Sequence, residues 1–210
     1  MEKQYWHDKW DSNEIGFHQD AAHPLLDSNF PSLELPKSSH VFVPLCGKSP
    51  DMLRLRDMGY RVSGLELSKV AVTAFFSENR LEYDTELEQD YERYTTEDLQ
   101  VLCGDYFRLD ARVLGQIDSV FDRASLVAMP PKMRSAYINI LRTLMVSGGK
   151  ILLIVLEYDQ DEISPPPFSI KKEEVIHLYS DWCHVELLET IDSEVKGRAC
   201  KETAYRLTVN

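Results

Sequence analysis

Apolar residues recur along this chain in short runs that are separated by amphipathic segments. Runs of this length, bounded by turn-forming residues, predict buried strands. Seven of them lie at residues 40–45, 61–67, 99–102, 117–121, 150–156, 185–189 and 203–209.

The segments between these runs carry helical patterns. Residues 50–58 predict a short helix that ends at Gly59, and Ser68 suits the N-cap of the helix that follows the second run. After Pro130-Pro131, apolar residues at three- and four-residue intervals predict a longer helix, and residues 171–179 predict a further one.

Strands that alternate with helices, followed by two strands close together, indicate an α/β fold. We expect a Rossmann-like, mostly parallel seven-stranded sheet with an antiparallel edge hairpin and helices on both faces. Residues 81–98 hold eight Asp or Glu among eighteen, and we expect them to form a solvated excursion outside the sheet. The chain has 210 residues, of which 43% are hydrophobic, so residues 1–210 predict a single domain.

Composition excludes several classes of protein. The 23 Lys and Arg against 35 Asp and Glu give a net charge of −12, which disfavours a nucleic-acid partner. The polar and aromatic start and the absence of a long apolar run predict a soluble, cytoplasmic protein without membrane contact. The four cysteines are widely separated and form no C-x-x-C motif, so we expect neither a metal nor a disulfide framework.

The turn after the first predicted strand carries an incomplete phosphate-binding pattern. Gly47-Lys48-Ser49 matches the end of a phosphate loop, but Phe42 stands where the first glycine is required. We therefore expect Lys48 to be exposed or to support a helix. A G-x-G-x-x-G motif is also missing, whereas Glu66 follows the second strand at the distance of a ribose-binding acid. This combination favours a phosphate-free adenosine ligand, for which S-adenosylmethionine is the obvious candidate.

The residues at the carboxyl ends of the strands are the expected ligand contacts, because open α/β sheets bind ligands at that edge. Glu66 can accept hydrogen bonds from both ribose hydroxyls, although a solvated strand end is the alternative. Asp105 reads an adenine amino group or only caps a turn after Gly104. Arg123 points into the cleft or pairs with Asp122.

Five blocks of sequence, in this order, resemble the bacterial branch of the thiopurine S-methyltransferase family. The blocks are Trp6 to Trp10 with Gly16-Phe17-His18, Val43 to Lys48, Gly64 to Ser68, Asp122 to Ala128 with Pro130 and Arg134, and Tyr158-Asp159 with Pro166-Pro167-Phe168. The resemblance runs from Tyr5 to Leu207. It implies a class I methyltransferase that uses S-adenosylmethionine, yields S-adenosylhomocysteine, and methylates aromatic and heterocyclic thiols such as thiopurines. Bacterial relatives extend the implied acceptors to selenium and tellurium compounds.

The resemblance also implies site residues. Residues 1–30 become a helical lid over the cofactor, which Phe17 helps to close. The second arginine that some members direct at the substrate has no clear match, and Arg198 is the only candidate. The implied cofactor contacts are Trp10, Leu45, Glu66, Asp105, Tyr106 and Arg123.

Methyl transfer to a thiolate needs alignment and a positive group more than a strong base. We expect Arg123 to be the catalytic residue that favours the thiolate, and His18 to accept a proton or to be merely structural. Pro166-Pro167-Phe168 is expected to present an apolar wall to a flat substrate, or to be a rigid connector with Phe168 in the core. An aromatic lid beside a sulfonium adds cation–π attraction, on the order of 1 kcal/mol, although Trp6 and Trp10 also fit a docked hydrophobic stripe.

Other functions remain open at this stage. A nucleotide hydrolase or kinase, or a dinucleotide-dependent oxidoreductase, lacks its glycine-rich turn here. A noncatalytic S-adenosylmethionine-binding protein and a methyltransferase for another small acceptor are the closer alternatives. A monomer with a small-molecule thiol substrate requires no further assumption.

Overall fold

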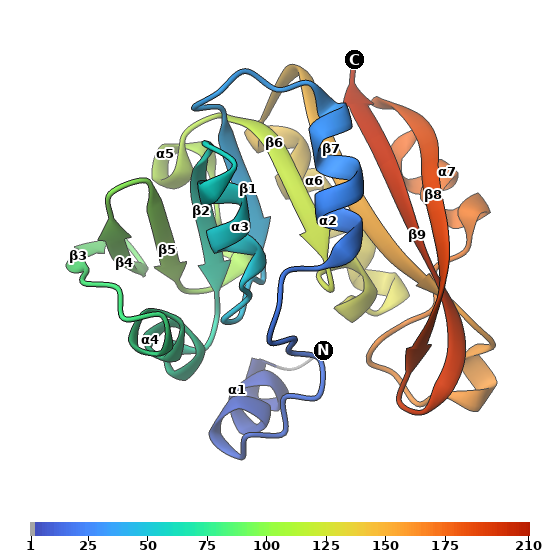
Figure 1. The fold of residues 1–210 in the computed structure, drawn as a ribbon, viewed down its shortest axis with the longest axis horizontal. Coiled ribbons are helices and arrows are strands. Elements are labelled where there is room, and N and C mark those ends of the chain that lie inside the picture. Colours follow the sequence, from blue (N-terminus) through green and yellow to red (C-terminus); the bar gives the residue numbers. More distant parts are fainter. Residues whose placement is uncertain (1–2) are drawn as a thin grey trace.

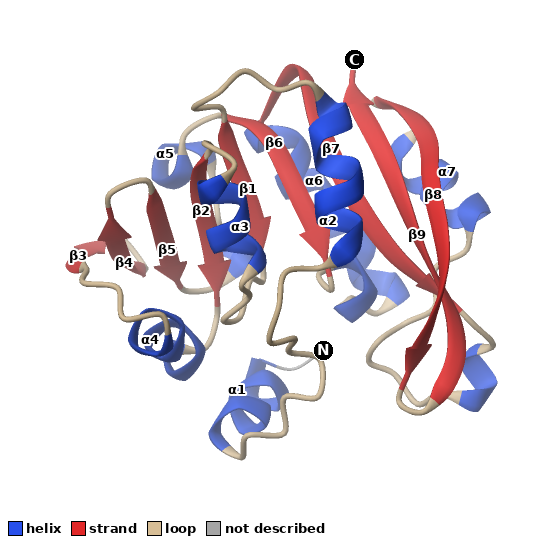
Figure 2. Cartoon of the chain, viewed as in Figure 1, coloured by secondary structure: helices blue, strands red, loops and turns tan. Residues whose placement is uncertain are grey.

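A nine-stranded sheet in the order β3-β4-β5-β2-β1-β6-β7-β9-β8 spans the molecule in the computed structural model, which describes residues 3–210 (Figures 1 and 2). Strands β5, β2, β1, β6 and β7 are mutually parallel, and β7, β9 and β8 are antiparallel. The strands are β1 (His40–Pro44), β2 (Arg61–Glu66), β3 (Asp84–Glu88), β4 (Tyr91–Thr96), β5 (Leu99–Cys103), β6 (Ile117–Arg123), β7 (Met145–Glu157), β8 (Cys183–Val195) and β9 (Arg198–Val209).

Seven α-helices and four short 3₁₀ segments connect these strands within the described residues. The α-helices are α1 (Lys3–Asp11), α2 (Pro24–Asn29), α3 (Asp51–Asp57), α4 (Lys69–Glu78), α5 (Ala111–Leu114), α6 (Pro131–Leu144) and α7 (Lys172–Tyr179). The 3₁₀ segments are η1 (Phe30–Leu33), η2 (Tyr106–Arg108), η3 (Leu126–Ala128) and η4 (Gln160–Glu162). The side chain of Ser68 accepts a hydrogen bond from the Ala71 backbone N–H at the start of α4, as its N-cap position predicts.

Helices cover both faces of the sheet, so the central strands are buried on two sides. On β1, Val41 and Val43 pack toward α2, α3 and α4, whereas Phe42 packs toward α5, α6 and α7. This alternation follows from the two-residue repeat of a strand. The expected class of fold, a parallel core with helices on both faces and an antiparallel C-terminal hairpin, is therefore confirmed.

The predicted number of strands was wrong, because residues 84–96 form the hairpin β3–β4 rather than a solvated excursion. The carboxylates of this hairpin lie at exposed or partly buried positions, while Tyr91 and Tyr94 are 2% and 1% exposed. Tyr91 joins one core layer and Tyr94 the other, so two residues anchor the hairpin on opposite faces of the sheet. The high charge of the surrounding residues is the reason that the sequence did not indicate the burial of Tyr91 and Tyr94.

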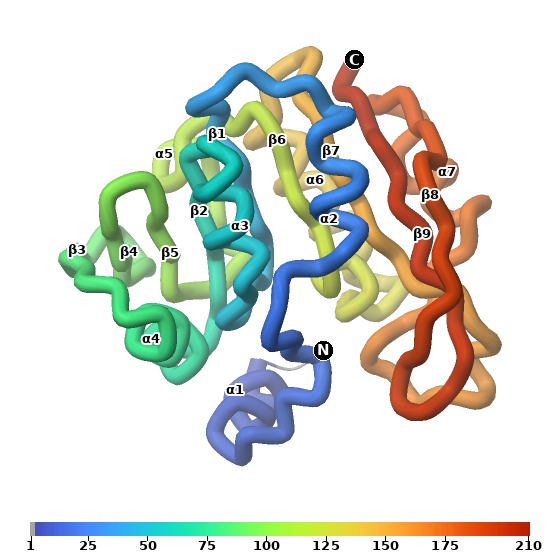
Figure 3. The backbone as a smooth tube through the Cα atoms, in the orientation of Figure 1, coloured from blue at the N-terminus to red at the C-terminus, as the bar shows by residue number. Residues whose placement is uncertain are grey.

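Two elements extend beyond the carboxyl ends of the central strands, on the same side of the molecule. Helix α1 lies there, in contact with α4, and a connection leads from it back to α2 (Figures 1 and 3). The β8–β9 hairpin also continues past the end of β7, because the last β7–β9 pair is Glu157 with Lys201 while β8 and β9 pair as far as Val195 with Arg198. These two elements enclose the space above the sheet edge.

Candidate active site

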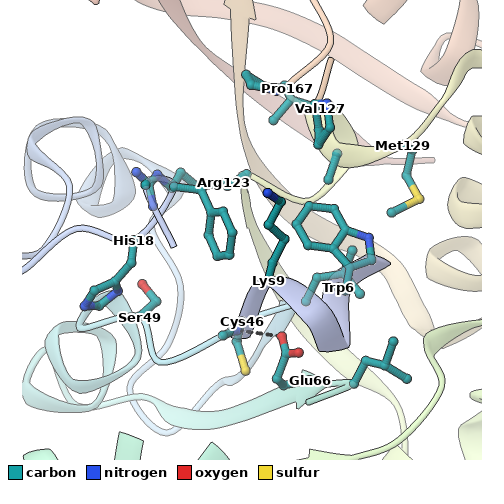
Figure 4. Close-up of a pocket in the computed structure, with 18 of the residues that line it drawn as sticks. Trp6, Lys9, His18, Cys46, Ser49, Glu66, Arg123, Val127, Met129 and Pro167 are labelled. Atoms are coloured by element: carbon teal, nitrogen blue, oxygen red, sulfur yellow. Dashed lines mark hydrogen bonds between the residues drawn. The ribbon is translucent and has the colours of Figure 1, made fainter. Parts of the chain in front are cut away.

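A cavity of about 620 Å³ lies at the carboxyl ends of β1, β2, β6 and β7, beneath α1 and beside the tip of the β8–β9 hairpin. Figure 4 shows Trp6 and Lys9 of α1 near Glu66 of β2 and Arg123 of β6 around it. Cavities of a few hundred cubic ångströms bind small molecules and cofactors. Trp10, Phe17, His18, Leu45, Glu66, Asp105, Tyr106 and Arg123, all expected from the sequence, line this cavity.

Glu66 is held by the backbone on both sides of its carboxylate. Its Oε2 accepts a 2.9 Å hydrogen bond from the Gly47 N–H, and its Oε1 accepts a 2.7 Å hydrogen bond from the Ser68 N–H. The residue is 6% exposed, and burial raises the pKa of its carboxyl group, while these backbone donors act in the opposite direction. Each oxygen keeps a further lone pair for a ligand.

The turn after β1 contains Gly47, whose N–H binds Glu66. This turn requires backbone in the left-handed conformation. Leu45 and Gly47 have φ values of +46° and +54°. The ring of Trp10 lies so close to Gly47 that an added Cβ would come within 2.9 Å of Trp10 Cζ2. Trp10 is 6% exposed, so α1 is packed directly on the turn.

Asp105 and Tyr106 form the wall beyond β5. Asp105 Oδ1 accepts a 3.0 Å hydrogen bond from the Phe107 N–H, and its Oδ2 forms a 2.6 Å ion pair with Lys3 of α1. The Tyr106 ring is 2% exposed and stacks on Tyr137 at a centroid distance of 4.7 Å. Asp105 therefore does cap a turn, and it also joins the lid to the cavity wall.

Arg123 is a cation that projects toward the cavity without a bound partner. Among residues 3–210, no side chain forms an ion pair or hydrogen bond with its guanidinium, and in particular Asp122 does not. Burial lowers the pKa of Arg123, and the nearby carboxylates of Asp51 and Glu202 oppose that shift. Its N–H donors are thus available to an anionic ligand.

A buried polar cluster that the sequence did not reveal lies at the base of the lid segment. The backbone N–H of His23 donates a 2.7 Å hydrogen bond to Asp51, and His23 Nε2 lies 2.6 Å from Glu202 Oε2. His23 Nδ1 accepts a 3.2 Å hydrogen bond from the Leu25 N–H, so the proton of a neutral ring is on Nε2 and faces Glu202. Asp51 and Glu202 are 151 positions apart in sequence, and no local pattern indicated that they meet.

The N-terminal segment that carries α1 and Phe17 is held together by aromatic contacts. The rings of Trp6 and Trp10 each meet the ring of Phe17 edge to face at centroid distances of 5.6 Å. His18 follows Phe17, and burial, together with the positive charge of Lys48, lowers its pKa. His18 is therefore a neutral group able to accept a proton at neutral pH.

One of the two expectations for Lys48 was an exposed side chain, and this expectation is wrong. Its side chain is only 13% exposed, lines the cavity, and forms a 2.7 Å ion pair with Glu78 of α4. This pair links the turn after β1 to the helix after β2. The alternative expectation, that Lys48 supports a helix, agrees with this contact.

Of the expected segment Pro166-Pro167-Phe168, the two prolines line the cavity and Phe168 does not. The Phe168 N–H donates to the Val127 carbonyl, and the ring turns away to lie 5.6 Å from the guanidinium of Arg134, beside a second, separate cavity. The direction of this side chain is decided by the loop, which the sequence pattern could not describe.

The tip of the β8–β9 hairpin brings a different cation to the site from the one considered in the sequence. Lys196, rather than Arg198, lines the cavity. Its Nζ donates hydrogen bonds of 2.8 and 2.7 Å to the carbonyls of Ser164 and Pro166. Lys196 therefore fastens the hairpin tip to the proline wall.

Within residues 3–210, no cluster of His, Cys, Asp and Glu is arranged to hold a metal ion. The four cysteines, all in the described part of the chain, are free, and burial raises the pKa of the cavity-lining Cys46 thiol well above its usual range. No helix of the described chain is long and apolar enough to cross a membrane.

Comparison with known proteins identifies close relatives. The family described as "Thiopurine S-methyltransferase (TPMT)" matches residues 1–208. Among its relatives, a thiopurine S-methyltransferase of Nitrosomonas eutropha is 46% identical over 91% of this chain and 87% of its own length. One of Pseudomonas putida is 38% identical over 99% of both chains.

Solved structures of other methyltransferases share the fold. The magnesium protoporphyrin IX methyltransferase of Synechocystis PCC 6803, with bound S-adenosylhomocysteine, aligns over 98% of this chain and 99% of its own with a TM-score of 0.67 and 14% identity. A Burkholderia thailandensis 1,6-didemethyltoxoflavin-N1-methyltransferase aligns over 98% of this chain and 87% of its own, with a TM-score of 0.65 and 16% identity.

Proposed function

The chain belongs to the thiopurine S-methyltransferase family, and on this premise we propose that Glu66 holds the methyl donor and Arg123 the thiolate acceptor at two ends of one cavity. The activity itself, S-adenosylmethionine-dependent thiopurine S-methylation, follows from the family and from relatives that match over most of the chain. The roles of individual residues, and the acceptors beyond thiopurines, are the content of the proposal.

The donor end fits an adenosyl group. Glu66 presents two carboxylate oxygens, each already oriented by one backbone N–H and each with a lone pair left for a ribose hydroxyl. Asp105 and Tyr106 stand next to it at the end of β5, where an adenine would lie, and Leu45 and Trp10 complete the apolar surface. S-adenosylmethionine supplies here a methyl group that is already activated on a sulfonium sulfur.

The observation that carries the acceptor assignment is the unpartnered guanidinium of Arg123. A partly buried cation without an ion pair is stabilised when an anion binds to it. A heterocyclic thiolate is such an anion, and hydrogen bonds from Arg123 would favour its ionised form. The lid above it and the walls of Pro166, Pro167 and Met129 exclude water and restrict the orientation of a flat ring.

Two further side chains support the acceptor in this proposal. Lys196 adds a second positive charge at the hairpin tip, where the family resemblance led us to expect an arginine. His18, neutral because burial lowers its pKa, accepts the proton of an acceptor that arrives as a thiol. Phe17 closes the lid over both.

Methyl transfer to 6-mercaptopurine and calorimetry with S-adenosylhomocysteine test these assignments on one pair of variants. Arg123→Met should lower kcat/KM by about 100-fold, roughly 2.7 kcal/mol, while reducing the affinity for S-adenosylhomocysteine by less than about tenfold. Arg112→Met, which removes an exposed arginine paired with Asp110, is the matched control and should change neither quantity. An Arg123→Met enzyme with unaltered kcat/KM would refute the acceptor assignment.

Selenolates and tellurolates are included in the proposal because they are soft anions that match the same cation and apolar walls. A methylation assay with an aromatic selenol, run beside its thiol analogue, measures this extension. Loss of both activities in Arg123→Met is expected, since one site serves both acceptors.

We also propose that residues 1–210 act as one domain, monomeric and cytoplasmic. Its lid is the part of residues 1–30 that precedes α2, since Leu25 and Leu26 of α2 lie in the core. The four free cysteines suit a reducing compartment. Sedimentation velocity tests the monomer, and a dimer at micromolar concentration would contradict it.

A further inference from the structure

A buried carboxylate with no part in the mechanism above lies directly beside Arg123. Asp122, on β6, is fully buried. Its Oδ1 accepts a 3.1 Å hydrogen bond from the Leu126 N–H, and its Oδ2 accepts a 2.7 Å hydrogen bond from the Tyr137 hydroxyl. No lysine, arginine or histidine of the described chain forms an ion pair with it. An unpaired buried charge costs folding free energy, which indicates a task other than stability.

On one side, Asp122 closes the turn that carries Arg123. The bond from Leu126 N–H spans Ala124, whose φ of +67° lies in the left-handed region that alanine disfavours. Ser125 Oγ donates a 2.6 Å hydrogen bond to the Pro44 carbonyl, which ties the same turn to the end of β1. These bonds hold a strained backbone conformation directly after Arg123.

On the other side, Asp122 reaches the wall of the donor site. The Tyr137 ring that it binds stacks on Tyr106 at 4.7 Å and 25°, and the Tyr106 hydroxyl donates a 2.9 Å hydrogen bond to the Tyr137 carbonyl. Tyr106 lines the cavity. The Asp122 carboxylate thus binds the turn that follows Arg123 and also the tyrosine, Tyr137, on which Tyr106 stacks.

We propose that Asp122 is a positioning residue for methyl transfer, whose ionised carboxylate holds the Arg123 turn and the Tyr106 wall in register. This inference rests on the proposed roles of Arg123 and of the donor end. The ionised carboxylate accepts hydrogen bonds from the Leu126 N–H and the Tyr137 hydroxyl and has no donor of its own. The protonated acid would carry an O–H group that needs a further acceptor.

The surroundings of Asp122 predict how its protonation responds to pH. The titratable groups that face it are Tyr137 of α6, Tyr106 of η2 and Tyr179 of α7. Burial raises the pKa of Asp122 to about 6, although hydrogen bonds from Tyr137 and Leu126 favour the ionised form. Below that pH the acid would carry a proton, and one of its two hydrogen bonds would be lost.

The experiment measures kcat/KM from about pH 5 to about pH 8 with 5-thio-2-nitrobenzoate, an aromatic thiol that is ionised over most of this range because of its nitro group. The intact enzyme should lose activity on the acid side with a midpoint near 6. Asp122→Asn should be at least about tenfold less active at pH 8 and should lack this acid limb, because it is neutral at every pH. Tyr137→Phe should move the limb to higher pH, because it removes a donor that favours the carboxylate.

Asp118→Asn is the matched control, since Asp118 lies on the same strand at the opposite end and binds only the His40 N–H. It should leave the limb unchanged. If Asp122→Asn does not fold, the shift in Tyr137→Phe decides alone. An unmoved limb in Tyr137→Phe, or an Asp122→Asn enzyme with the intact profile, overturns the inference. Failure of the intact enzyme to bind S-adenosylhomocysteine by calorimetry would instead refute the proposed function.

Discussion

The backbone N–H of Gly47 donates a 2.9 Å hydrogen bond to Oε2 of Glu66, and this bond joins the turn after β1 to the end of β2. The two strands are parallel neighbours, with Pro44 paired to Leu65, so their ends lie side by side. The carboxylate is therefore oriented before any ligand arrives. Preorganisation of this kind reduces the entropic cost of binding.

Glu66→Gln should weaken the binding of S-adenosylhomocysteine by about 10-fold to 100-fold, roughly 1.4–2.7 kcal/mol. The amide has one oxygen for two backbone donors, so its NH₂ group would face either the Gly47 or the Ser68 N–H. Isothermal titration calorimetry measures the loss. Glu92→Gln, at an exposed pair with Lys69, is the control and should bind normally.

The affinity for S-adenosylhomocysteine should also depend on pH through Glu66. Burial raises the pKa of this carboxyl group, and the ribose hydroxyls require the ionised form. Affinity should therefore be full above the raised pKa and should decline as the pH falls through it. Titrations across the acidic range measure this decline, and an identical pH dependence in Glu66→Gln would assign it to another group.

Gly47→Ala should lose both stability and cofactor affinity. The substitution forces alanine to a φ of +54°, and its Cβ would come within 2.9 Å of Trp10 Cζ2. Gly148→Ala, at +76° with no atom within 4 Å of the new Cβ, carries only the backbone cost of about 1 kcal/mol. Thermal denaturation should show a loss in both variants, whereas calorimetry should show weaker binding only in Gly47→Ala. Equal binding in the two would contradict the packing of the lid on this turn.

Phe17→Ala should loosen the lid without unfolding the protein. Phe17 is 38% exposed, yet its ring contacts both Trp6 and Trp10. Loss of two edge-to-face contacts, worth about 0.5–1.5 kcal/mol each, should increase the dissociation rate of S-adenosylhomocysteine by about tenfold. Stopped-flow tryptophan fluorescence measures this rate. Leu87→Ala, at a residue that is 82% exposed and far from the lid in sequence, should leave it unchanged.

Asp122→Asn should be at least as stable as the intact enzyme at neutral pH, despite its lower activity. The folded-state pKa of about 6 is above the unfolded value of 3.8, so the folded state binds protons more tightly. Stability from this group is therefore present below the unfolded pKa and is lost as the pH rises through the folded one. The asparagine of Asp122→Asn is neutral at every pH and avoids this loss in the free energy of unfolding, about 1–3 kcal/mol. Urea unfolding at pH 7 and pH 5 measures it, and a marked destabilisation at pH 7 would contradict the reasoning.

Local sequence patterns were sufficient for the central architecture. The apolar runs marked β1, β2, β5, β6 and β7, and the N-cap at Ser68 was recognisable because capping depends on a residue and its immediate neighbours. The hairpin β3–β4 was missed because two buried tyrosines stabilise it within a highly charged segment. Here burial in the tertiary structure outweighed composition.

For the site too, the sequence predicted some features and could not predict others. Parallel strands bring their carboxyl ends to one edge, so the order of elements already placed Glu66, Asp105 and Arg123 together. The sequence could not decide whether Arg123 pairs with Asp122, because that depends on side-chain direction. In the structure Asp122 binds the Tyr137 hydroxyl, and no residue among 3–210 forms an ion pair with the guanidinium.

What the sequence determined by itself was therefore the alternation of strands and helices, the acid after β2, and the family that the ordered motifs resemble, since each depends on spacing along the chain. Only the tertiary structure decided that Pro167 rather than Phe168 lines the cavity, that Lys196 lines it from the hairpin tip, and that Glu202 meets His23. These contacts join residues far apart in the chain, and their geometry is set by the packing of whole elements rather than by any local pattern.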